Sequence, residues 1–380
     1  MPTAALVSFR LGGTDGVSVE AAKWQWALGR LGFDVRTVAG EGPVDHLLPG
    51  LSIGATRPPA ATDVAAALAG ADLVVVENLC SLPLNPAASA VVAEACRGRP
   101  TVLHHHDLPW QRPHLAHHPP PPDDPAWCHV TINDISRAEL GRRGIDAVTV
   151  HNAFDLDPAP GRREATRRAL GIDDDVRLVL QPTRALPRKN VAGGVALAEA
   201  VGGTYWLLGP PEDGFGPELD RILAGAACPV VRGPAGPPGG SQVADAYAAC
   251  DVVTLPSTWE GFGNPAIESA VQRKPLAIGP YPVAAELAAF GFRWFALADH
   301  EALGRWLASP EPSLLRHNRD VAERFFSLAD LPGRLDLVLN GLPLARHSPR
   351  PPAGRAAGQA APRSDGPERR SHGGRTPGTR

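Results

Sequence analysis

The stretch DLVVVENLCSLPLNPAASAVVAEACRGRPTVLHHH, residues 72–106, decides the fold class of this chain. It opens with the apolar run DLVVVEN (72–78), continues with the helix candidate PAASAVVAEACRG (86–98) and closes with a second apolar run, PTVLHHH (100–106). Continuous apolar strands of this kind are buried on both faces, and a helix between two of them indicates a parallel sheet. We therefore predict an α/β fold.

The same alternation extends in both directions from this stretch. Upstream, AALVSF (4–9) reads as a first strand, and the helical pattern of residues 17–32 follows it after a Gly-rich turn. Downstream, the alternation pauses at FDLDPAPG (154–161) and resumes as a second series, from VRLVLQP (176–182) to RWFALA (293–298). Two consecutive series of this kind indicate two domains.

We predict two doubly wound Rossmann-like domains, residues 1–155 and 156–344, which face each other across a cleft. The helical segment 312–342 would close the second domain. Residues 345–380 are mostly Pro, Gly, Arg and Ser with almost nothing to bury, so we expect a disordered basic tail. Ligands of such sheets bind at the carboxyl ends of the strands, and the functional residues should gather there.

Composition excludes several classes of protein. The 380 residues are 43% hydrophobic and 20% charged with a formal net charge of −3, which is typical of a soluble globular protein and argues against nucleic-acid binding. The five cysteines form no CxxC pair, so reduced thiols in the cytoplasm are the simplest account. No stretch reaches the roughly 20 apolar residues that cross a bilayer, which leaves only peripheral membrane contact.

The stretch EGFGNPAIE, residues 260–268, contains two acids eight positions apart. That spacing suits neither a helix face nor a metal-binding loop. Asn264 followed by Pro265 is a good helix start, with Asn as N-cap and Pro in the first turn. Glu260 should therefore lie in a strand-to-helix loop, and Glu268 one turn into the helix. The glycines and the helix N-terminus would favour an anion such as pyrophosphate.

This stretch resembles the E-x7-E signature of retaining nucleotide-sugar glycosyltransferases of family 4, which have the GT-B fold. The resemblance implies that Glu260 contacts hydroxyls of the donor sugar and that Glu268 holds the ribose. It further implies that the residues between them offer backbone amides to the sugar and the phosphates; these donor-binding residues are Gly261, Phe262, Gly263 and Asn264. The family more often has Leu or Met at the position of Asn264.

A second match is TRALPRKN, residues 183–190, which follows a predicted strand. In the family, an arginine and a lysine five residues later supply two cations to the diphosphate, and here these would be Arg184 and Lys189. Fixed cations stabilise the charge that grows on the leaving phosphate. Thr183 stands where the family has glycine, and we expect Arg188 to lie outside the site.

The Gly-rich loop RLGGTDGVS, residues 10–18, follows the first strand. In the family this loop lies between the donor phosphates and the acceptor. The resemblance implies that Gly12 and Gly13 bind the donor and that Asp15 binds an acceptor hydroxyl. Gly-rich first turns are also common in α/β proteins for packing reasons.

The stretch TVLHHHDLPW, residues 101–110, is the densest polar cluster. On a strand, His104 and His106 share one face and His105 the other. A zinc site is an alternative, but no cysteine or carboxylate spacing supports it, and we expect no metal. The family has a histidine at the end of this strand beside the donor sugar, which implies that His106 is catalytic and that Asp107 binds the acceptor.

Three further positions match the family with less specific roles. Asn152 and Asp155 lie at the expected hinge between the domains, where structural roles are the more natural ones. The stretch PLAIGPYPVAAEL (275–287) takes the place of a family Gly-Gly-x-x-Glu turn; Tyr281 and Pro282 replace the two glycines, and only Glu286 carries over.

The resemblance covers residues 4 to 340 and implies a hexosyltransferase that acts with retention on a nucleoside-diphosphate sugar, GDP- or UDP-linked. The sugar would pass to a small polar or glycosidic acceptor, with no permanently bound cofactor. His106, Arg184, Lys189 and Glu260 would be its catalytic residues. The combination of motifs is most similar to the mannosylglucosyl-phosphoglycerate synthase subgroup.

Two alternatives remain open at the level of sequence. One is a sugar-nucleotide epimerase or hydrolase of the same fold, and the other is a non-catalytic protein that binds nucleotide sugars. The sequence leaves the sugar, the acceptor and the oligomeric state undetermined.

Overall fold

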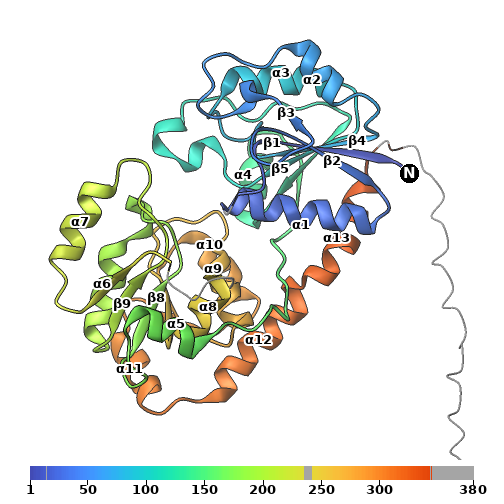
Figure 1. Ribbon diagram of the computed structural model, residues 1–380. Helices are drawn as coiled ribbons and strands as arrows, with labels where there is room; N and C mark the ends of the chain where they lie inside the picture. Colours follow the sequence, from blue (N-terminus) through green and yellow to red (C-terminus); the bar gives the residue numbers. More distant parts are fainter. Residues whose placement is uncertain (14, 235–241, 343, 345–380) are drawn as a thin grey trace, which may run out of the picture. The chain divides into compact units, whose positions relative to one another are not determined.

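The computed structural model describes residues 1–13, 15–234, 242–342 and 344. The predicted disordered tail, residues 345–380, lies outside the described residues. Two parallel β-sheets with helices around each of them make up the described chain (Figure 1). The predicted α/β architecture of two doubly wound units is thereby confirmed, whereas a cleft between them stays a prediction.

The first sheet has seven parallel strands in the order β3-β2-β1-β4-β5-β6-β7. Its strands are β1 (Thr3–Arg10), β2 (Asp34–Glu41), β3 (His46–Leu47), β4 (Leu73–Glu77), β5 (Thr101–His105), β6 (Trp127–Thr131) and β7 (Ala147–Thr149). The second sheet has six parallel strands in the order β10-β9-β8-β11-β12-β13. Its strands are β8 (Leu178–Gln181), β9 (Thr204–Leu207), β10 (Val230–Arg232), β11 (Val252–Leu255), β12 (Leu276–Ile278) and β13 (Phe295–Ala296).

The described helices connect these strands. They are α1 (Gly16–Arg30), α2 (Ala61–Ala67), α3 (Pro86–Cys96), α4 (Asp134–Gly141), α5 (Arg163–Leu170), α6 (Val191–Ala200), α7 (Gly216–Ala224), α8 (Gln242–Ala249), α9 (Asn264–Val271), α10 (Pro282–Ala289), α11 (His300–Ala308), α12 (Pro312–Phe326) and α13 (Leu331–Leu339). Short 3-10 turns are η1 (Pro49–Leu51), η2 (Pro109–Gln111), η3 (Pro113–Leu115), η4 (Pro187–Lys189) and η5 (Leu328–Asp330). None of the helices among the described residues has the length and apolar character needed to cross a membrane.

Strand order places the functional edge of each sheet. In both sheets the order reverses between the first strand and the fourth, that is, between β1 and β4 and between β8 and β11. At each reversal, the loops after the two neighbouring strands leave in opposite directions. This opens space at the carboxyl ends of the strands, where α/β proteins bind ligands. Any ligand site of this chain is therefore expected beside these four strand ends.

Each sheet is buried on both faces, because successive side chains of a strand point to opposite sides. On β1, Ala4 and Leu6 pack with α1 and α13, whereas Ala5 and Val7 pack with α2 and α3. The second sheet divides in the same way, with α8, α9 and α10 on one face and α6, α7 and α11 on the other. The continuous apolar runs of the sequence are thus explained.

The C-terminal helices differ from the prediction in one respect. Helix α12 packs against α9 of the second unit. Helix α13, however, packs against α1, and Leu331, Leu335 and Leu339 enter the core of the first sheet (Figure 1). The last helix therefore packs on the first sheet, although its sequence lies within the predicted second domain, 156–344. Its apolar face completes the cover of β1.

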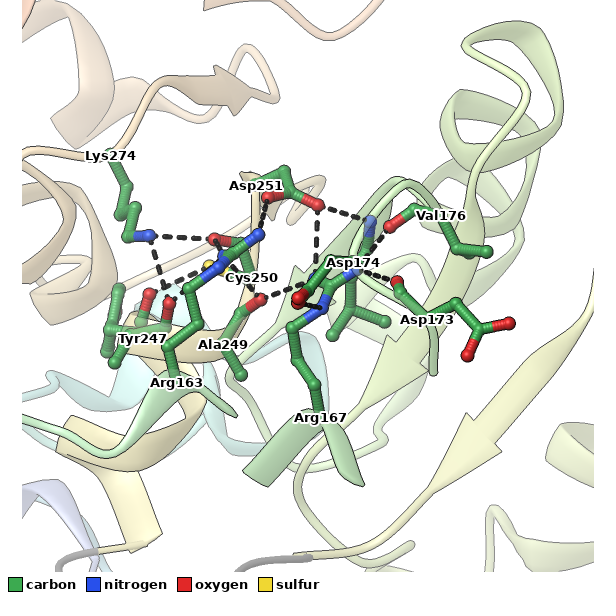
Figure 2. Close-up of polar contacts among 12 residues, drawn as sticks. Arg163, Arg167, Asp173, Asp174, Val176, Tyr247, Ala249, Cys250, Asp251 and Lys274 are labelled. Carbon is green, nitrogen blue, oxygen red and sulfur yellow. Dashed lines mark hydrogen bonds and ion pairs between the residues drawn. The ribbon is translucent and has the colours of Figure 1, made fainter. Parts of the chain in front are cut away.

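A network of three cations, of which Arg167 is buried, fixes the corner between α8 and β11 (Figure 2). Arg163 and Lys274 donate to the carbonyl of Cys250, at 3.3 and 2.7 Å. Arg167, only 1% exposed, donates to the carbonyls of Ala249 at 2.8 Å and Val176 at 2.5 Å and pairs with Asp251 at 3.3 Å. These cations satisfy carbonyls that a helix C-terminus leaves without partners. They tie α5 to the start of β8 and β11.

Replacing Arg167 by Leu should lower the free energy of unfolding by about 3 kcal/mol, because Asp251 and the carbonyls of Ala249 and Val176 would each lose a charged donor. Thermal unfolding followed by circular dichroism measures the effect. Arg168→Leu is the matched control, because Arg168 is exposed on the same helix. Equal unfolding temperatures of the two variants would contradict the structural role given to Arg167.

Candidate functional site

The sequence-predicted residues follow the ends of four strands, three of which border a reversal of strand order. Gly12 and Asp15 follow β1, and His106 follows β5, the strand next to β4. Arg184 and Lys189 follow β8, and Glu260 follows β11. The prediction that functional residues gather at carboxyl ends of strands agrees with this arrangement.

Glu260 lies in a buried ion pair. Its carboxylate is 2.5 and 2.6 Å from Nζ of Lys189, and Ser257 donates its hydroxyl to Oε1 at 2.6 Å. Arg188 adds a contact of 3.3 Å to Oε2. The expectation that Arg188 lies outside the site is wrong, because η4 turns its side chain toward the same carboxylate. Three charged side chains thus meet at one point. The sequence predicted separate roles for two of them, Glu260 at the sugar and Lys189 at the phosphates.

Burial and charge shift the pKa of both partners of this pair. Burial by itself would raise the pKa of Glu260, but Lys189 and Arg188 lower it overall. Burial lowers the pKa of Lys189, and the attraction of Glu260 offsets this only in part. The site therefore holds a carboxylate that stays ionised and a lysine whose charge depends on its partner.

The start of helix α9 differs from the prediction. Gly263 and not Asn264 is the N-cap, at φ 99°, where only glycine is comfortable. A Cβ at Gly263 would lie 2.1 Å from the hydroxyl of Tyr281, so that tyrosine fills the space of the side chain that is missing. Asn264 instead accepts a hydrogen bond from Asn152 at 2.9 Å, which links α9 to the segment between the sheets.

Glu268 lies in α9 and is held by a tyrosine. The hydroxyl of Tyr247 on α8 donates to Oε2 of Glu268 at 2.7 Å. Burial raises the pKa of Glu268, and the hydrogen bond from Tyr247 and the charge of Lys23 on α1 partly counteract this. Tyr247 therefore orients the carboxylate.

The Gly-rich loop places its predicted residues at the start of α1. Gly12 has φ 74°, in the left-handed region. Asp15 is the N-cap of α1, and its carboxylate accepts from the amide of Ser18 at 3.2 Å, from the Ser18 hydroxyl at 2.8 Å and from Arg10 at 3.1 Å. Burial would raise the pKa of Asp15, but these hydrogen bonds lower it overall. Asp15 thus has a capping role, and acceptor binding by it stays a prediction.

Arg184 faces both the second unit and this loop. It donates to Glu212 at 2.5 Å with its side chain 34% exposed. Its charge also contributes to the lowered pKa of Asp15. Arg184 is therefore less confined than Lys189, and its role at the diphosphate stays a prediction.

The histidine cluster contains a carboxylate that the sequence argument overlooked. Glu77, the last residue of β4, accepts from Nδ1 of His104 at 2.8 Å and from Nε2 of His106 at 2.9 Å, both at Oε2. His104 and His106 share a face as predicted, and His105 points the other way, to Ser81 at 2.6 Å. The ligand atoms of Glu77, His104 and His106 lie within 4.8 Å of one another, a spacing that would also admit a metal ion.

The argument that no carboxylate accompanies these histidines is therefore wrong. Glu77 is 27 residues before His104 in sequence but pairs with it in the register of two neighbouring strands. The sequence signal that could have found it is a lone acid at the carboxyl end of an apolar strand. The structure itself leaves the expectation of no metal untested.

Several contacts join the loops of the two sheets at this place. Asn133 donates to the carbonyl of Gly261 at 2.6 Å, and a Cβ at Gly261 would lie 2.6 Å from the carbonyl of His106 and 3.1 Å from Asp107. The loop after β11 therefore lies against the loop after β5. Glu286 caps α4 by accepting from the amide of Asp134 at 2.9 Å. That contact gives Glu286 a structural role.

No protein-family model matches the sequence. Two curated relatives match most of it. The mannosylglucosylglycerate synthase of Thermotoga maritima is 26% identical over 420 residues, which cover 86% of this chain and 97% of that protein. The enzyme of the same name from Petrotoga mobilis is 25% identical and covers 77% of this chain and 86% of that protein. A D-inositol 3-phosphate glycosyltransferase of Mycobacterium tuberculosis is 31% identical over 193 residues, 38% of its length.

Solved structures agree on the fold. Anabaena HepE in complex with UDP-glucose is similar with a TM-score of 0.67 and 18% identity, covering 89% of this chain and all of that one. Sucrose-phosphate synthase of Thermosynechococcus elongatus has a TM-score of 0.67 at 15% identity and covers 90% and 98% of the two chains. The chain therefore has the GT-B fold of glycosyltransferases, and the resemblance to these enzymes that its motifs carry is confirmed.

Replacing Lys189 by Met should destabilise the protein by about 3 kcal/mol at neutral pH, because Glu260 would be buried without its main partner. The pKa of Glu260 would then rise, so the variant should lose less stability at mildly acidic pH, where the carboxyl is protonated. Thermal unfolding at both pH values measures this. Arg188→Met is the control and should cost about 1 kcal/mol, because that side chain is 32% exposed. A Lys189 variant as stable as wild type at neutral pH would refute the buried pair.

Proposed function

We propose that this chain is a retaining glycosyltransferase that moves a hexose from a nucleoside-diphosphate sugar to a small polar acceptor. The observation that carries the proposal is the convergence of Lys189, Glu260 and Arg188 after β8 and β11, with Glu268 on α9, the helix that follows the loop of Glu260. The likeness to mannosylglucosylglycerate synthases over most of the chain supports the same function.

The second unit would bind the donor. Glu268, oriented by Tyr247, would accept hydrogen bonds from the two ribose hydroxyls. The loop residues Gly261 to Gly263 and the N-terminus of α9 would face the diphosphate, because backbone N–H groups and the helix dipole favour an anion there. Lys189 and Arg184 would supply positive charge from the other side. Glu260, which Lys189 keeps ionised, would accept from sugar hydroxyls.

The chemistry would proceed on one face of the sugar. The bond between the anomeric carbon and the phosphate oxygen breaks, and a bond from that carbon to an acceptor oxygen forms on the same face. The acceptor proton passes to the leaving phosphate. Arg184 and Lys189 stabilise the negative charge that develops on the diphosphate, which lowers the barrier. His106 would lie beside the sugar and help to place its anomeric carbon.

The acceptor would be bound by the first unit, with Asp15 and Asp107 as the predicted residues. The name mannosylglucosylglycerate describes a mannosyl group joined to glucosylglycerate, and it belongs to the relatives. Glucosylglycerate and its phosphorylated form, with GDP-mannose, are therefore the first acceptor and donor to test. Hydrolysis of the donor without an acceptor would instead favour the hydrolase alternative.

A panel of GDP-, UDP- and ADP-hexoses should identify the donor by thermal stabilisation. At about 100 times the dissociation constant, binding contributes about 2.7 kcal/mol, which should raise the unfolding temperature by about 5 °C. Glu268→Gln should abolish most of the shift, and the exposed Glu94→Gln should leave it unchanged. If no member of the panel stabilises wild type, the proposed function fails.

Arg184→Ala should lower kcat about 100-fold with a smaller change in the donor KM, because the leaving diphosphate loses a fixed cation in the transition state. Initial rates of nucleoside-diphosphate release measure both constants. Arg232→Ala is a matched control on the same unit, where Arg232 pairs with Asp220 at the surface.

Glu212→Gln tests whether Arg184 acts on the diphosphate or only through its ion pair. It removes the ion-pair partner of Arg184 but leaves the cation in place. We expect it to retain most of the activity. If Glu212→Gln and Arg184→Ala lose activity equally, Arg184 acts only through its ion pair.

A further inference from the structure

Glu77 stands at the place where the first sheet opens. It is the last residue of β4, and β4 lies beside β1 at the reversal of strand order. In the register of the sheet, Glu77 lies between Ser8 on β1 and His104 on β5. Its side chain is fully buried. A buried carboxylate at this position is costly unless its charge is compensated, so its presence needs a reason.

The two imidazoles that contact Glu77 are not equivalent. His104 is fully buried, stacks on Trp24 with 4.1 Å between ring centroids, and has its Nε2 buried without a hydrogen-bond partner. His106 is 7% exposed, and among the described residues no hydrogen bond engages its Nδ1. Only His106 therefore offers a nitrogen to a ligand.

The backbone of His106 is fixed by Asn78, the residue that follows Glu77 at the end of β4. Asn78, at φ 58°, accepts from the amide of His106 at 3.1 Å and from the amide of Asp107 at 3.3 Å. Glu77 and Asn78 thus hold both the ring and the main chain of His106. The glycine loop after β11 reaches this point, since a Cβ at Gly261 would lie 2.6 Å from the carbonyl of His106.

We propose that Glu77 is a positioning residue for His106: it holds Nε2 so that the ring, when protonated, presents Nδ1–H toward the donor sugar. This inference rests on the proposed function and deepens it. Glu77 touches no substrate atom in this account and acts only through His106.

The electrostatics around the cluster agree with a single positive charge on His106. Burial alone would lower the pKa of His106, but the hydrogen bond and charge of Glu77 raise it overall, with Glu20 of α1 and Asp107 adding to the effect. The neighbouring His104 has a lowered pKa, chiefly because of burial, and stays neutral.

The remaining charged group of the cluster is Glu77 itself. Burial would raise the pKa of Glu77, but the two histidines bring it down to about 2. His105, on the opposite face of β5, is held neutral by burial. Because the pKa of His106 is raised, its charge is present at low pH and is lost as pH rises through that pKa.

NMR titration of wild type tests the inference without any substrate. The His106 resonance, identified by its absence in His106→Gln, should titrate above the ordinary pKa of histidine, and in Glu77→Gln its pKa should fall by about one unit or more. Glu77→Asp keeps the charge and should retain a higher pKa than Glu77→Gln. A wild-type His106 that titrates at or below the ordinary value overturns the proposal, even if Glu77→Gln does not fold.

Kinetics supply the second readout. With a working donor, kcat should decline as pH rises. In Glu77→Gln this decline should occur about one pH unit lower, so that kcat is about 10-fold lower near neutral pH. The donor KM of Glu77→Gln should stay within about 3-fold of wild type. Glu94→Gln is the matched control and should behave as wild type. An unmoved pH limb, or a loss expressed only in KM, overturns the proposal.

Two further outcomes separate this inference from its alternatives. Stoichiometric binding of Zn²⁺ to wild type but not to Glu77→Gln, measured by calorimetry, would overturn the proposal in favour of a metal site. Wild type could instead bind the donor and show the expected raised pKa of His106, yet transfer no sugar to any acceptor. That result would contradict the proposed transfer but not the effect of Glu77 on His106.

Discussion

The reversal of strand order in each parallel sheet is the constraint on which the rest of this structure depends. All strands of a parallel sheet end at the same edge, and only at the reversal do neighbouring loops leave in opposite directions. The chain meets this condition twice, at β1 and β4 and at β8 and β11. The glycine-rich loop, Glu77, Lys189 and Glu260 all follow or end these strands. Because Gly261 has no side chain, the loop after β11 lies against the carbonyl of His106.

Two buried charge clusters lie at these edges, and in both of them a buried carboxylate is stabilised by basic side chains. Lys189 shields Glu260 in one, and two histidines shield Glu77 in the other. Buried ion pairs contribute little net stability, because the loss of hydration offsets the attraction between the charges. Under the proposed function, the charges of both clusters are retained because they bind the donor or position a residue that does. Cations elsewhere, such as Arg167 under α8, satisfy helix carbonyls and serve the scaffold.

The departures from the commoner family pattern have local explanations in the packing. Tyr281 stands where a glycine is usual, and its hydroxyl fills the space beside Gly263. Asn264 replaces an apolar residue and accepts a hydrogen bond from Asn152. Pro282 begins α10, whose Glu286 caps α4. Each of these residues makes a contact of its own, and the two acids of the E-x7-E motif are kept.

The sequence by itself determined the α/β class, the two series of strands and helices and the strand ends at which functional residues lie. It could do so because burial on both faces of a parallel sheet imposes continuous apolar runs, and because loops after strands are local features. Only the tertiary structure decided which charges meet. Glu77 joins His104 through strand register, Arg188 turns toward Glu260, and α13 returns to the first sheet. These contacts join residues far apart in the chain, and no local periodicity encodes them.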